Sequence, residues 1–313
     1  MSKELSVTVV EEPDTRVNIA GIALQNPVMT ASGTFGYGEE YDSLFDLGQL
    51  GAIVVKAITS KPRLGNPPPR VVETAAGMLS SCGLQNVGVD RFINDKMPFL
   101  KKVGIPVIVN ITGESVDEFA VLGDRLSNTE GISALELNVS CPNVRQGGMV
   151  FGRDPAMVRQ IVRAVKAESA IPVICKLTPN VTDIVEVAAA AADGGADAVS
   201  LINALLGLAI DVESGRPKLG NITGGLTGPA IKPVALRMVW EVARAVPVPV
   251  IGIGGITTEA DALEFIMAGA AAVQVGTANF FRPKATVEIA EGIKRFMRRK
   301  GYKSLTELRG LAQ

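Results

Sequence analysis

The sequence predicts an α/β protein, a (β/α)8 TIM barrel with an N-terminal β-hairpin and extended βα loops. Eight short, apolar, β-branched segments alternate along the chain with longer segments of helical periodicity. Parallel strands that helices cover on both faces are apolar throughout, and eight such strands close a barrel. Glycine-rich turns follow the last two strands, where barrels bind phosphate. We therefore expect residues 1–313 to form a single barrel domain.

The predicted strands and helices alternate in a regular order. The strands are residues 28–31, 52–56, 107–111, 134–140, 172–177, 198–203, 249–254 and 272–277. Helical patterns cover residues 115–126, 154–168, 181–194, 231–245 and 257–268. An open, doubly wound sheet is the competing architecture. Its usual G-x-G-x-x-G turn is absent after the first strand, which runs into TASGTFGYG.

Two segments extend the predicted barrel. SVTVV and RVNIA precede the first strand, and we expect them to form a hairpin that closes the barrel floor. Residues 57–100 include RLGNPPPR and SSCGLQN, and we expect an extended second loop there rather than a separate domain.

The composition excludes several classes of protein. The 31 basic and 32 acidic residues give a net charge of −1, whereas a nucleic-acid-binding surface needs a clustered positive excess. No apolar run reaches the roughly 18 residues of a membrane span, and the N-terminus lacks a signal-peptide pattern, so we expect a cytoplasmic protein. Cys82, Cys141 and Cys175 lack the spacing of a zinc or iron–sulfur site, so no metal is expected.

Polar residues end several of the apolar strands. In a barrel these positions face the active-site mouth. They are Ser32, Lys56, Asn110, Asn138, Lys176, Asn203, Gly254, Gly255, Gly276 and Thr277, with Cys141 and Asn143 close behind Asn138. A buried lysine without a partner is costly, so two lysines at one mouth indicate function rather than packing.

Three glycine-rich turns predict a phosphate site. TGGLTGP at 223–229 is expected in the loop after the sixth strand, and GIGGI at 252–256 and VGTAN at 275–279 follow the last two strands. Glycines let backbone amides approach an anion closely. Such a cradle suits a phosphorylated cofactor as well as a phosphorylated substrate.

The chain contains no histidine, so a general base must be Cys, Lys, Asp, Glu or Tyr. Cys141 lies in NVSCPN, a polar loop at the predicted mouth, and is a candidate nucleophile or base. Cys175 lies inside a strand next to Lys176 and points the opposite way, so we expect it to pack in the core.

Six motifs in order resemble the class 1 dihydroorotate dehydrogenase family, and most closely the catalytic subunits of its NAD-linked class 1B. The motifs are NPVMTASGTFG at 26–36, GNPPPR at 65–70, NVSCPNV at 138–144, KLTP at 176–179, TGGLTGPA at 223–230 and VGTAN at 275–279. The run GGMVFGRDP at 147–155 is also similar to the 1B pattern.

The resemblance implies FMN at the barrel mouth and oxidation of (S)-dihydroorotate to orotate in de novo pyrimidine biosynthesis. Cys141 would remove the C5 proton, hydride would pass from C6 to flavin N5, and Lys176 would stabilise the reduced flavin. The flavin ring and ribityl chain would contact Ser32, Lys56, Ala57, Asn110, Asn138, Lys176 and Ile202. The ribityl and phosphate end would contact Gly228, Gly254, Gly255, Gly276 and Thr277.

The resemblance also implies a substrate site and a protein partner. The pyrimidine and its carboxylate would be held by Lys56, Asn138, Asn143, Asn203 and Ala204 and by the segment Ser80, Ser81, Cys82, Gly83 and Leu84. Electrons would pass to a second subunit that carries FAD and a two-iron two-sulfur cluster, and then to NAD. A homodimeric core within a heterotetramer is expected.

Two segments depart from the family pattern. Ser80 and Cys82 stand in SSCGL where the family usually has N-x-M/I-G-L, and Ala204 stands where Thr or Ser is usual. The lost groups normally contact the pyrimidine. An FMN oxidoreductase acting on another pyrimidine, cyclic amide or enoate therefore remains an alternative. A lyase, isomerase or synthase that binds a sugar phosphate would be colourless and would leave Lys176 and Cys141 unexplained.

Overall fold

The computed structural model describes residues 12–139 and 151–313, and it confirms the barrel. Eight parallel strands lie in the order β3-β16-β15-β10-β9-β8-β7-β4, and a parallel bridge between Met29 and Ala52 joins the two outermost strands. The strands are β3 (Val28–Thr30), β4 (Ile53–Ile58), β7 (Val107–Ile111), β8 (Ala134–Asn138), β9 (Val173–Lys176), β10 (Ala198–Leu201), β15 (Val250–Ile253) and β16 (Ala272–Val275).

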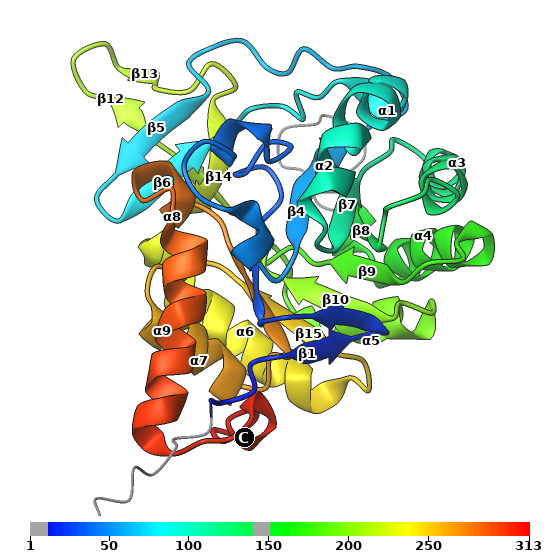
Figure 1. The fold of residues 1–313 in the computed structure, drawn as a ribbon. Helices are drawn as coiled ribbons and strands as arrows, with labels where there is room; N and C mark the ends of the chain where they lie inside the picture. Colours follow the sequence, from blue (N-terminus) through cyan, green and yellow to red (C-terminus); the bar gives the residue numbers. More distant parts are fainter. Residues whose placement is uncertain (1–11, 140–150) are drawn as a thin grey trace, which may run out of the picture.

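Helices surround this sheet (Figure 1). Side chains of Ser115, Asp154, Asp183 and Thr258 accept hydrogen bonds from backbone N–H groups in the first turns of four of them, which is why those helices begin there. The main helices are α2 (Met97–Val103), α3 (Val116–Ser127), α4 (Pro155–Glu168), α5 (Ile184–Asp193), α6 (Lys232–Ala245), α7 (Glu259–Met267) and α9 (Ala285–Lys300). Shorter turns are α1 (Gly88–Arg91), α8 (Ala278–Phe281), η1 (Glu39–Tyr41), η2 (Leu47–Gln49), η3 (Phe92–Lys96), η4 (Phe151–Arg153), η5 (Pro229–Ile231) and η6 (Leu305–Glu307).

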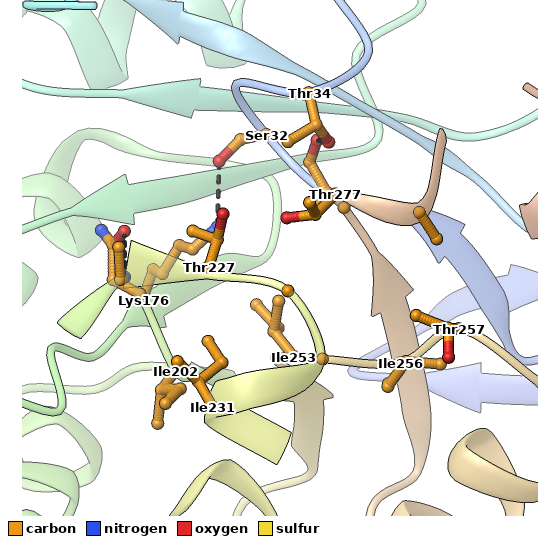
Figure 2. Close-up of a pocket in the computed structure, with 18 residues that line it drawn as sticks. Ser32, Thr34, Lys176, Ile202, Thr227, Ile231, Ile253, Ile256, Thr257 and Thr277 are labelled. Carbon is orange, nitrogen blue, oxygen red and sulfur yellow. Dashed lines mark hydrogen bonds between the residues drawn. The ribbon is translucent and has the colours of Figure 1, made fainter. Parts of the chain in front are cut away.

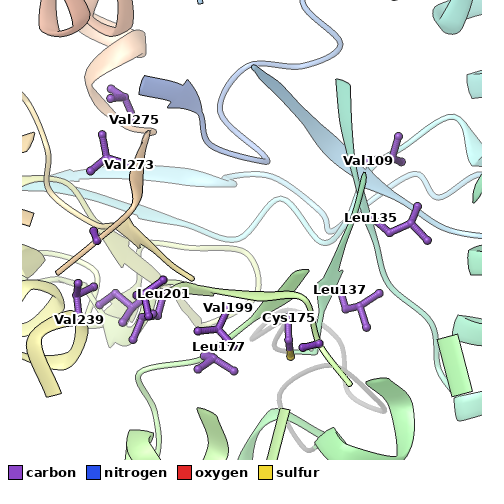
Figure 3. Close-up of a cluster of buried hydrophobic side chains, with 14 of the residues drawn as sticks. Val109, Leu135, Leu137, Cys175, Leu177, Val199, Leu201, Val239, Val273 and Val275 are labelled. Atoms are coloured by element: carbon purple, nitrogen blue, oxygen red, sulfur yellow. The ribbon is translucent and has the colours of Figure 1, made fainter. Parts of the chain in front are cut away.

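Alternate residues of each strand serve two different cores. Outward-facing side chains such as Val109, Leu135, Cys175, Val199 and Val273 belong to the large core under the helices (Figure 3). Inward-facing side chains low in the barrel are apolar as well, and they are Met29, Val54, Ile108, Ala134, Ile174, Ala198, Ile251 and Ala272. Two residues further along six of these strands the sequence turns polar: Asn110, Glu136, Lys176, Ser200 and Gln274 are buried there, and Lys56 in β4 is partly buried. The barrel interior is therefore apolar at its floor and polar below its mouth.

The floor hairpin differs in part from the prediction. RVNIA forms β1 (Val17–Ile19), but it pairs with β2 (Ile22–Leu24), which directly follows it. Ala20 and Gly21 both have positive φ, 52° and 91°, as a two-residue hairpin turn requires. SVTVV, the expected partner, lies outside the described residues. Ile19, Ile22 and Leu24 pack into the apolar floor.

A four-stranded antiparallel sheet stands over the barrel mouth, in the order β11-β14-β6-β5. It joins β5 (Val71–Thr74) and β6 (Gly77–Ser80) from the loop after β4 to β11 (Leu205–Leu208) and β14 (Thr223–Thr227) from the loop after β10. Residues 57–100 are thus more ordered than the expected loop, and most of the glycine-rich run 223–229 is a strand. A small hairpin, β12 (Ile210–Asp211) with β13 (Arg216–Pro217), extends beside it. Within residues 12–139 and 151–313, no helix has the length and apolar character to cross a membrane.

Candidate active site

A cavity of about 530 Å³ lies at the barrel mouth between the ends of β3, β9, β10, β15 and β16. Figure 2 shows Lys176 hydrogen-bonded to Ser32 in its wall, with Thr227 and Thr277 nearby. Predicted flavin-contacting residues in the wall are Ser32, Lys176, Ile202, Gly228, Gly254, Gly255, Gly276 and Thr277. The structure therefore gathers both expected ends of the cofactor site, ring and phosphate, around one cavity.

The glycines at this cavity bring separate turns close together. A Cβ on Gly255 would lie 2.8 Å from the backbone nitrogen of Lys232 and 2.9 Å from the carbonyl oxygen of Gly228. Outside the strand ladders of the described residues, the N–H groups of Gly255, Gly276 and Thr277 donate to no backbone carbonyl. N–H groups in two neighbouring turns are therefore available to an anion.

A second cavity of about 960 Å³ adjoins the first and reaches up to the antiparallel sheet. Ser32, Thr34, Asn203, Ala204 and Thr227 line both cavities, so the two spaces share a wall. Predicted substrate-contacting residues in the second cavity are Lys56, Ser80, Cys82, Gly83, Leu84, Asn138, Asn203 and Ala204, and Ala57 lies with them. Val71, Met78 and Phe280 also line it and have no counterpart in the sequence prediction.

The two lysines of the site have different surroundings. Lys176 is 4% exposed; its Nζ lies 2.9 Å from Ser32 Oγ and 3.6 Å from a carboxylate oxygen of Glu136. Lys56 is partly buried in the second cavity, and burial lowers the pKa of its ammonium, against a smaller opposing effect of Cys82. Cys82 Sγ lies 3.5 Å from Ser80 Oγ.

Two of the predicted site residues that the structure describes line neither cavity. Asn110 is fully buried and donates to Glu136 over 2.6 Å, and the Ser81 side chain is also fully buried. Cys141 and Asn143 lie outside the described residues. Cys175 is completely buried, and burial, with a smaller contribution from Glu136, raises its pKa to about 12, in keeping with the expected packing role.

Glu136 is a charged residue of this region that the sequence analysis also missed. It is fully buried in β8, two residues before Asn138. Its charge could have revealed it in the sequence, because Glu136 is the one charged residue in a five-residue strand that is otherwise apolar up to Asn138.

Comparison of the sequence with known proteins identifies the family of this chain. A family model described as dihydroorotate dehydrogenase matches residues 15–297. The chain belongs to the dihydroorotate dehydrogenase family. It is 58% identical over 299 residues to a protein of Pelobacter propionicus, 57% over 300 residues to one of Geobacter sulfurreducens and 56% over 299 residues to one of Geotalea uraniireducens. Each match covers 96% of this chain and 98% of the relative. All three relatives are named dihydroorotate dehydrogenase B (NAD(+)), catalytic subunit.

Dihydroorotate dehydrogenases are flavin-dependent. The residues around the first cavity could hold a flavin that carries a phosphate group. The phosphate would meet the turns at Gly255 and Gly276, where a side chain on Gly255 would collide with backbone. The ring would lie toward Lys176 and Ile202. Below them the side-chain oxygen of Asn110 is buried and has no hydrogen-bond partner among the described residues. This oxygen is an acceptor that a bound flavin could use.

Proposed function

We propose that this protein oxidises (S)-dihydroorotate to orotate, the redox step of de novo pyrimidine biosynthesis, with FMN as its own cofactor. The observation that carries the proposal is the shared wall of the two cavities: residues suited to a flavin line one side, and residues suited to a small polar acid line the other. The names of the relatives point to the same reaction.

The first cavity is the proposed FMN site. Gly228, Gly254, Gly255, Gly276 and Thr277 would hold the ribityl and phosphate end with backbone groups. Ser32, Lys176 and Ile202 would contact the ring, with Asn110 beneath and Lys56, Ala57 and Asn138 toward the second cavity. The chemistry that FMN supplies is acceptance of a hydride. The ammonium of Lys176 would stabilise the negative charge that hydride transfer brings to the ring.

The second cavity is the proposed substrate site. Lys56 provides a positive charge for the substrate carboxylate, as a point contact rather than a fork. Asn138 and Asn203 supply amides for the pyrimidine, and the side-chain nitrogen of Asn203 donates to the side-chain oxygen of Asn138 over 3.1 Å, which orients both groups. Asn143 is a further proposed substrate ligand.

We assign removal of the C5 proton to Cys141. It follows Asn138, a residue of the second cavity wall, by three positions in the sequence. The chain has no histidine to take this role, and the two cysteines that the structure describes are poorer candidates. Cys175 faces the outer core, and Cys82 lies beside Ser80 on the β6 side of the cavity.

We also propose an electron-transfer partner subunit that carries FAD and a two-iron two-sulfur cluster and passes electrons to NAD. The curated relatives are named catalytic subunits of NAD(+)-linked enzymes, which implies a second subunit in those proteins. A homodimer of this chain bound to two such partners, a heterotetramer, is the proposed assembly.

One observation favours a second candidate, an FMN oxidoreductase for another pyrimidine, cyclic amide or enoate. Ser80, Cys82 and Ala204 all line the second cavity, and each departs from the family pattern. Ala204 offers no side-chain hydrogen bond, so a ligand with fewer polar groups would also fit there.

The visible spectrum of the purified chain tests the proposal. We expect a yellow protein with about one FMN per chain and bleaching of the flavin when dihydroorotate is added without oxygen. A flavin that stays oxidised with dihydroorotate but bleaches with another cyclic amide would favour the second candidate. A colourless chain that takes up no FMN would contradict both.

A further inference from the structure

Glu136 is a carboxylate that no step of the proposed reaction uses, although it lies fully buried directly below the site. It points into the barrel from β8, at the level where the interior changes from apolar to polar. Removing a carboxylate from water is costly unless donors surround it. A residue at this place needs either strong compensation or a function.

Four side chains from four other strands converge on this carboxylate. Asn110 Nδ2 lies 2.6 Å from Oε2, while Gln274 Nε2 and Ser200 Oγ lie 2.7 and 2.9 Å from Oε1. Lys176 Nζ is 3.6 Å from Oε2. Since an ionised carboxylate only accepts hydrogen bonds, it fixes which way its neighbours point.

The first consequence concerns the two amides. Asn110 and Gln274 must turn their NH₂ groups to Glu136, so their oxygens face away. Both oxygens are buried without a hydrogen-bond partner among the described residues. Glu136 thereby orients two side-chain oxygens that remain free to accept hydrogen bonds from a ligand. The oxygen of Asn110 is the more relevant of the two, because the family resemblance places Asn110 beside the flavin.

The second consequence concerns charge. Lys176 stands between Glu136 and Ser32, and Ser32 belongs to the walls of both cavities. The lysine side chain is 5% exposed and the glutamate 0%, so water screens the pair very little. The positive charge that reaches the cavity is the charge of Lys176 reduced by that of Glu136.

We propose that Glu136 is a positioning residue for the flavin: it holds Lys176 and Asn110 in place and limits the positive charge that Lys176 presents to the cofactor. The inference rests on the proposed function in one respect, that a flavin occupies the first cavity. It predicts that loss of the Glu136 charge makes the bound flavin more electrophilic, and that this effect requires Lys176.

Sulfite measures this property without turnover. Its sulfur lone pair forms a bond to N5 of an oxidised flavin, and the added negative charge stays on the ring, so nearby positive charge strengthens binding. We expect Glu136→Gln to bind sulfite about tenfold or more tightly than the wild type, because the Lys176 charge is no longer offset. An unchanged or weaker sulfite affinity in a variant that retains flavin overturns the proposal.

Two comparisons separate this role from a merely structural one. In a Lys176→Met background, Glu136→Gln should change sulfite affinity by less than about twofold, because a buried carboxyl group that has lost its cation is held neutral and the substitution then removes no charge. Ser200→Ala removes a hydrogen bond to the same carboxylate but no charge, and it should also have less than about a twofold effect. An equal effect of Glu136→Gln in both backgrounds overturns the proposal.

A measurement on the cofactor-free chain distinguishes failure of this inference from failure of the proposed function. Urea unfolding of both single variants and the double variant should give a coupling of about tenfold or more in the unfolding equilibrium constant, because removing one partner leaves the other charge buried alone. If Glu136→Gln alone does not fold, recovery of folding by adding Lys176→Met supports the pairing. Additive effects, or a double variant that still fails to fold, overturn it. A wild-type chain without affinity for FMN contradicts the proposed function instead.

Discussion

Lys56 and Lys176 lie in the walls of adjoining cavities but are stabilised differently. Lys176 has the Glu136 carboxylate within 3.6 Å, whereas no described carboxylate lies within 4 Å of the Lys56 ammonium. A buried cation without an ion pair gives up its proton more readily. The proposed carboxylate-binding group is therefore sensitive to pH.

We expect orotate to bind more weakly as the pH rises through the lowered pKa of Lys56. Below that pKa the ammonium is charged and attracts the carboxylate, and above it the attraction is lost, for a decrease of about tenfold or more in affinity. Orotate titrations of the flavoprotein between about pH 7 and 10 measure this change. The range lies below about 10.4, the reference pKa of a lysine, because the pKa of Lys56 is lowered. Lys56→Met should bind weakly at every pH, and a variant with the wild-type pH profile would exclude Lys56 as the cause.

Cys141 gives the second prediction at this scale. Cys141→Ala should keep its flavin but lose dihydroorotate-driven reduction by roughly 10²–10⁴-fold, the usual contribution of a positioned base. Cys141→Ser should recover activity at high pH, because a hydroxyl gives up its proton less readily than a thiol. Stopped-flow bleaching of the flavin measures the rates. Cys82→Ala is the control, and a larger loss in that variant would move the base to Cys82.

Ser80 and Ala204, which depart from the family pattern, give the third prediction at this scale. Both residues line the second cavity, so restoring the family side chains with Ser80→Asn and Ala204→Thr should tighten orotate by roughly 10–100-fold through two added contacts. The perturbation of the flavin spectrum by orotate reports the affinity. Val71→Thr adds a hydroxyl elsewhere in the same cavity and should have little effect. Equal or weaker binding by the double variant would mean that neither position contacts substrate.

The residues that follow the glycine-rich turn after β15 are held by a side chain of the next helix. Asp261, in the first turn of α7, accepts hydrogen bonds from Thr257 N at 2.9 Å, Thr258 N at 2.8 Å and Lys232 Nζ at 2.7 Å. Burial alone would raise the pKa of Asp261, but Lys232 and the Thr257 and Thr258 donors hold it far below its ordinary value. Thr257 lines the first cavity, so this carboxylate positions one wall of the proposed phosphate site.

We therefore expect Asp261→Asn to weaken FMN binding by about tenfold and to lower the free energy of unfolding by about 1–3 kcal/mol, since an amide cannot accept from all of these donors. FMN fluorescence titration and urea unfolding measure the two quantities. Because the folded pKa is depressed, this stabilisation is present above the unfolded value of about 3.9 and is lost as the pH falls toward the folded pKa. Glu264→Gln removes a more exposed partner of Lys232 and is the control, expected within about 0.5 kcal/mol of the wild type. Equal effects of the two substitutions would contradict a positioning role for Asp261.

At the scale of the whole molecule, the proposed electron-transfer subunit makes a prediction about NAD reduction. No G-x-G-x-x-G turn follows its first strand, and three separated cysteines do not form an iron–sulfur site. We expect the purified chain to reduce NAD poorly with dihydroorotate, to turn over with an artificial acceptor, and to gain NAD reduction when the electron-transfer subunit is added. Absorbance at the NADH band follows the reaction. Efficient NAD reduction by the chain alone would contradict the proposed partner.

The sequence by itself determined the eight strands, their alternation with helices and most of the strand-end residues. These features follow from local periodicity: a strand buried on both faces is apolar throughout, and a polar residue at its end is conspicuous. The six motifs added the family and the grouping of site residues into a cofactor side and a substrate side. Lys56 and Lys176 stood out for the same physical reason, the cost of burying an unpaired charge.

Only the tertiary structure decided which segments meet. The floor hairpin pairs RVNIA with the chain that follows it, and the glycine-rich run 223–229 is recruited into a sheet with β6, which lies more than a hundred residues earlier. In the sequence, Glu136 is a single charged residue in a predicted strand. In the structure, four other strands place Asn110, Lys176, Ser200 and Gln274 around its carboxylate. Pairing between distant segments depends on long-range packing rather than on local periodicity, and a single sequence does not encode it in any short window.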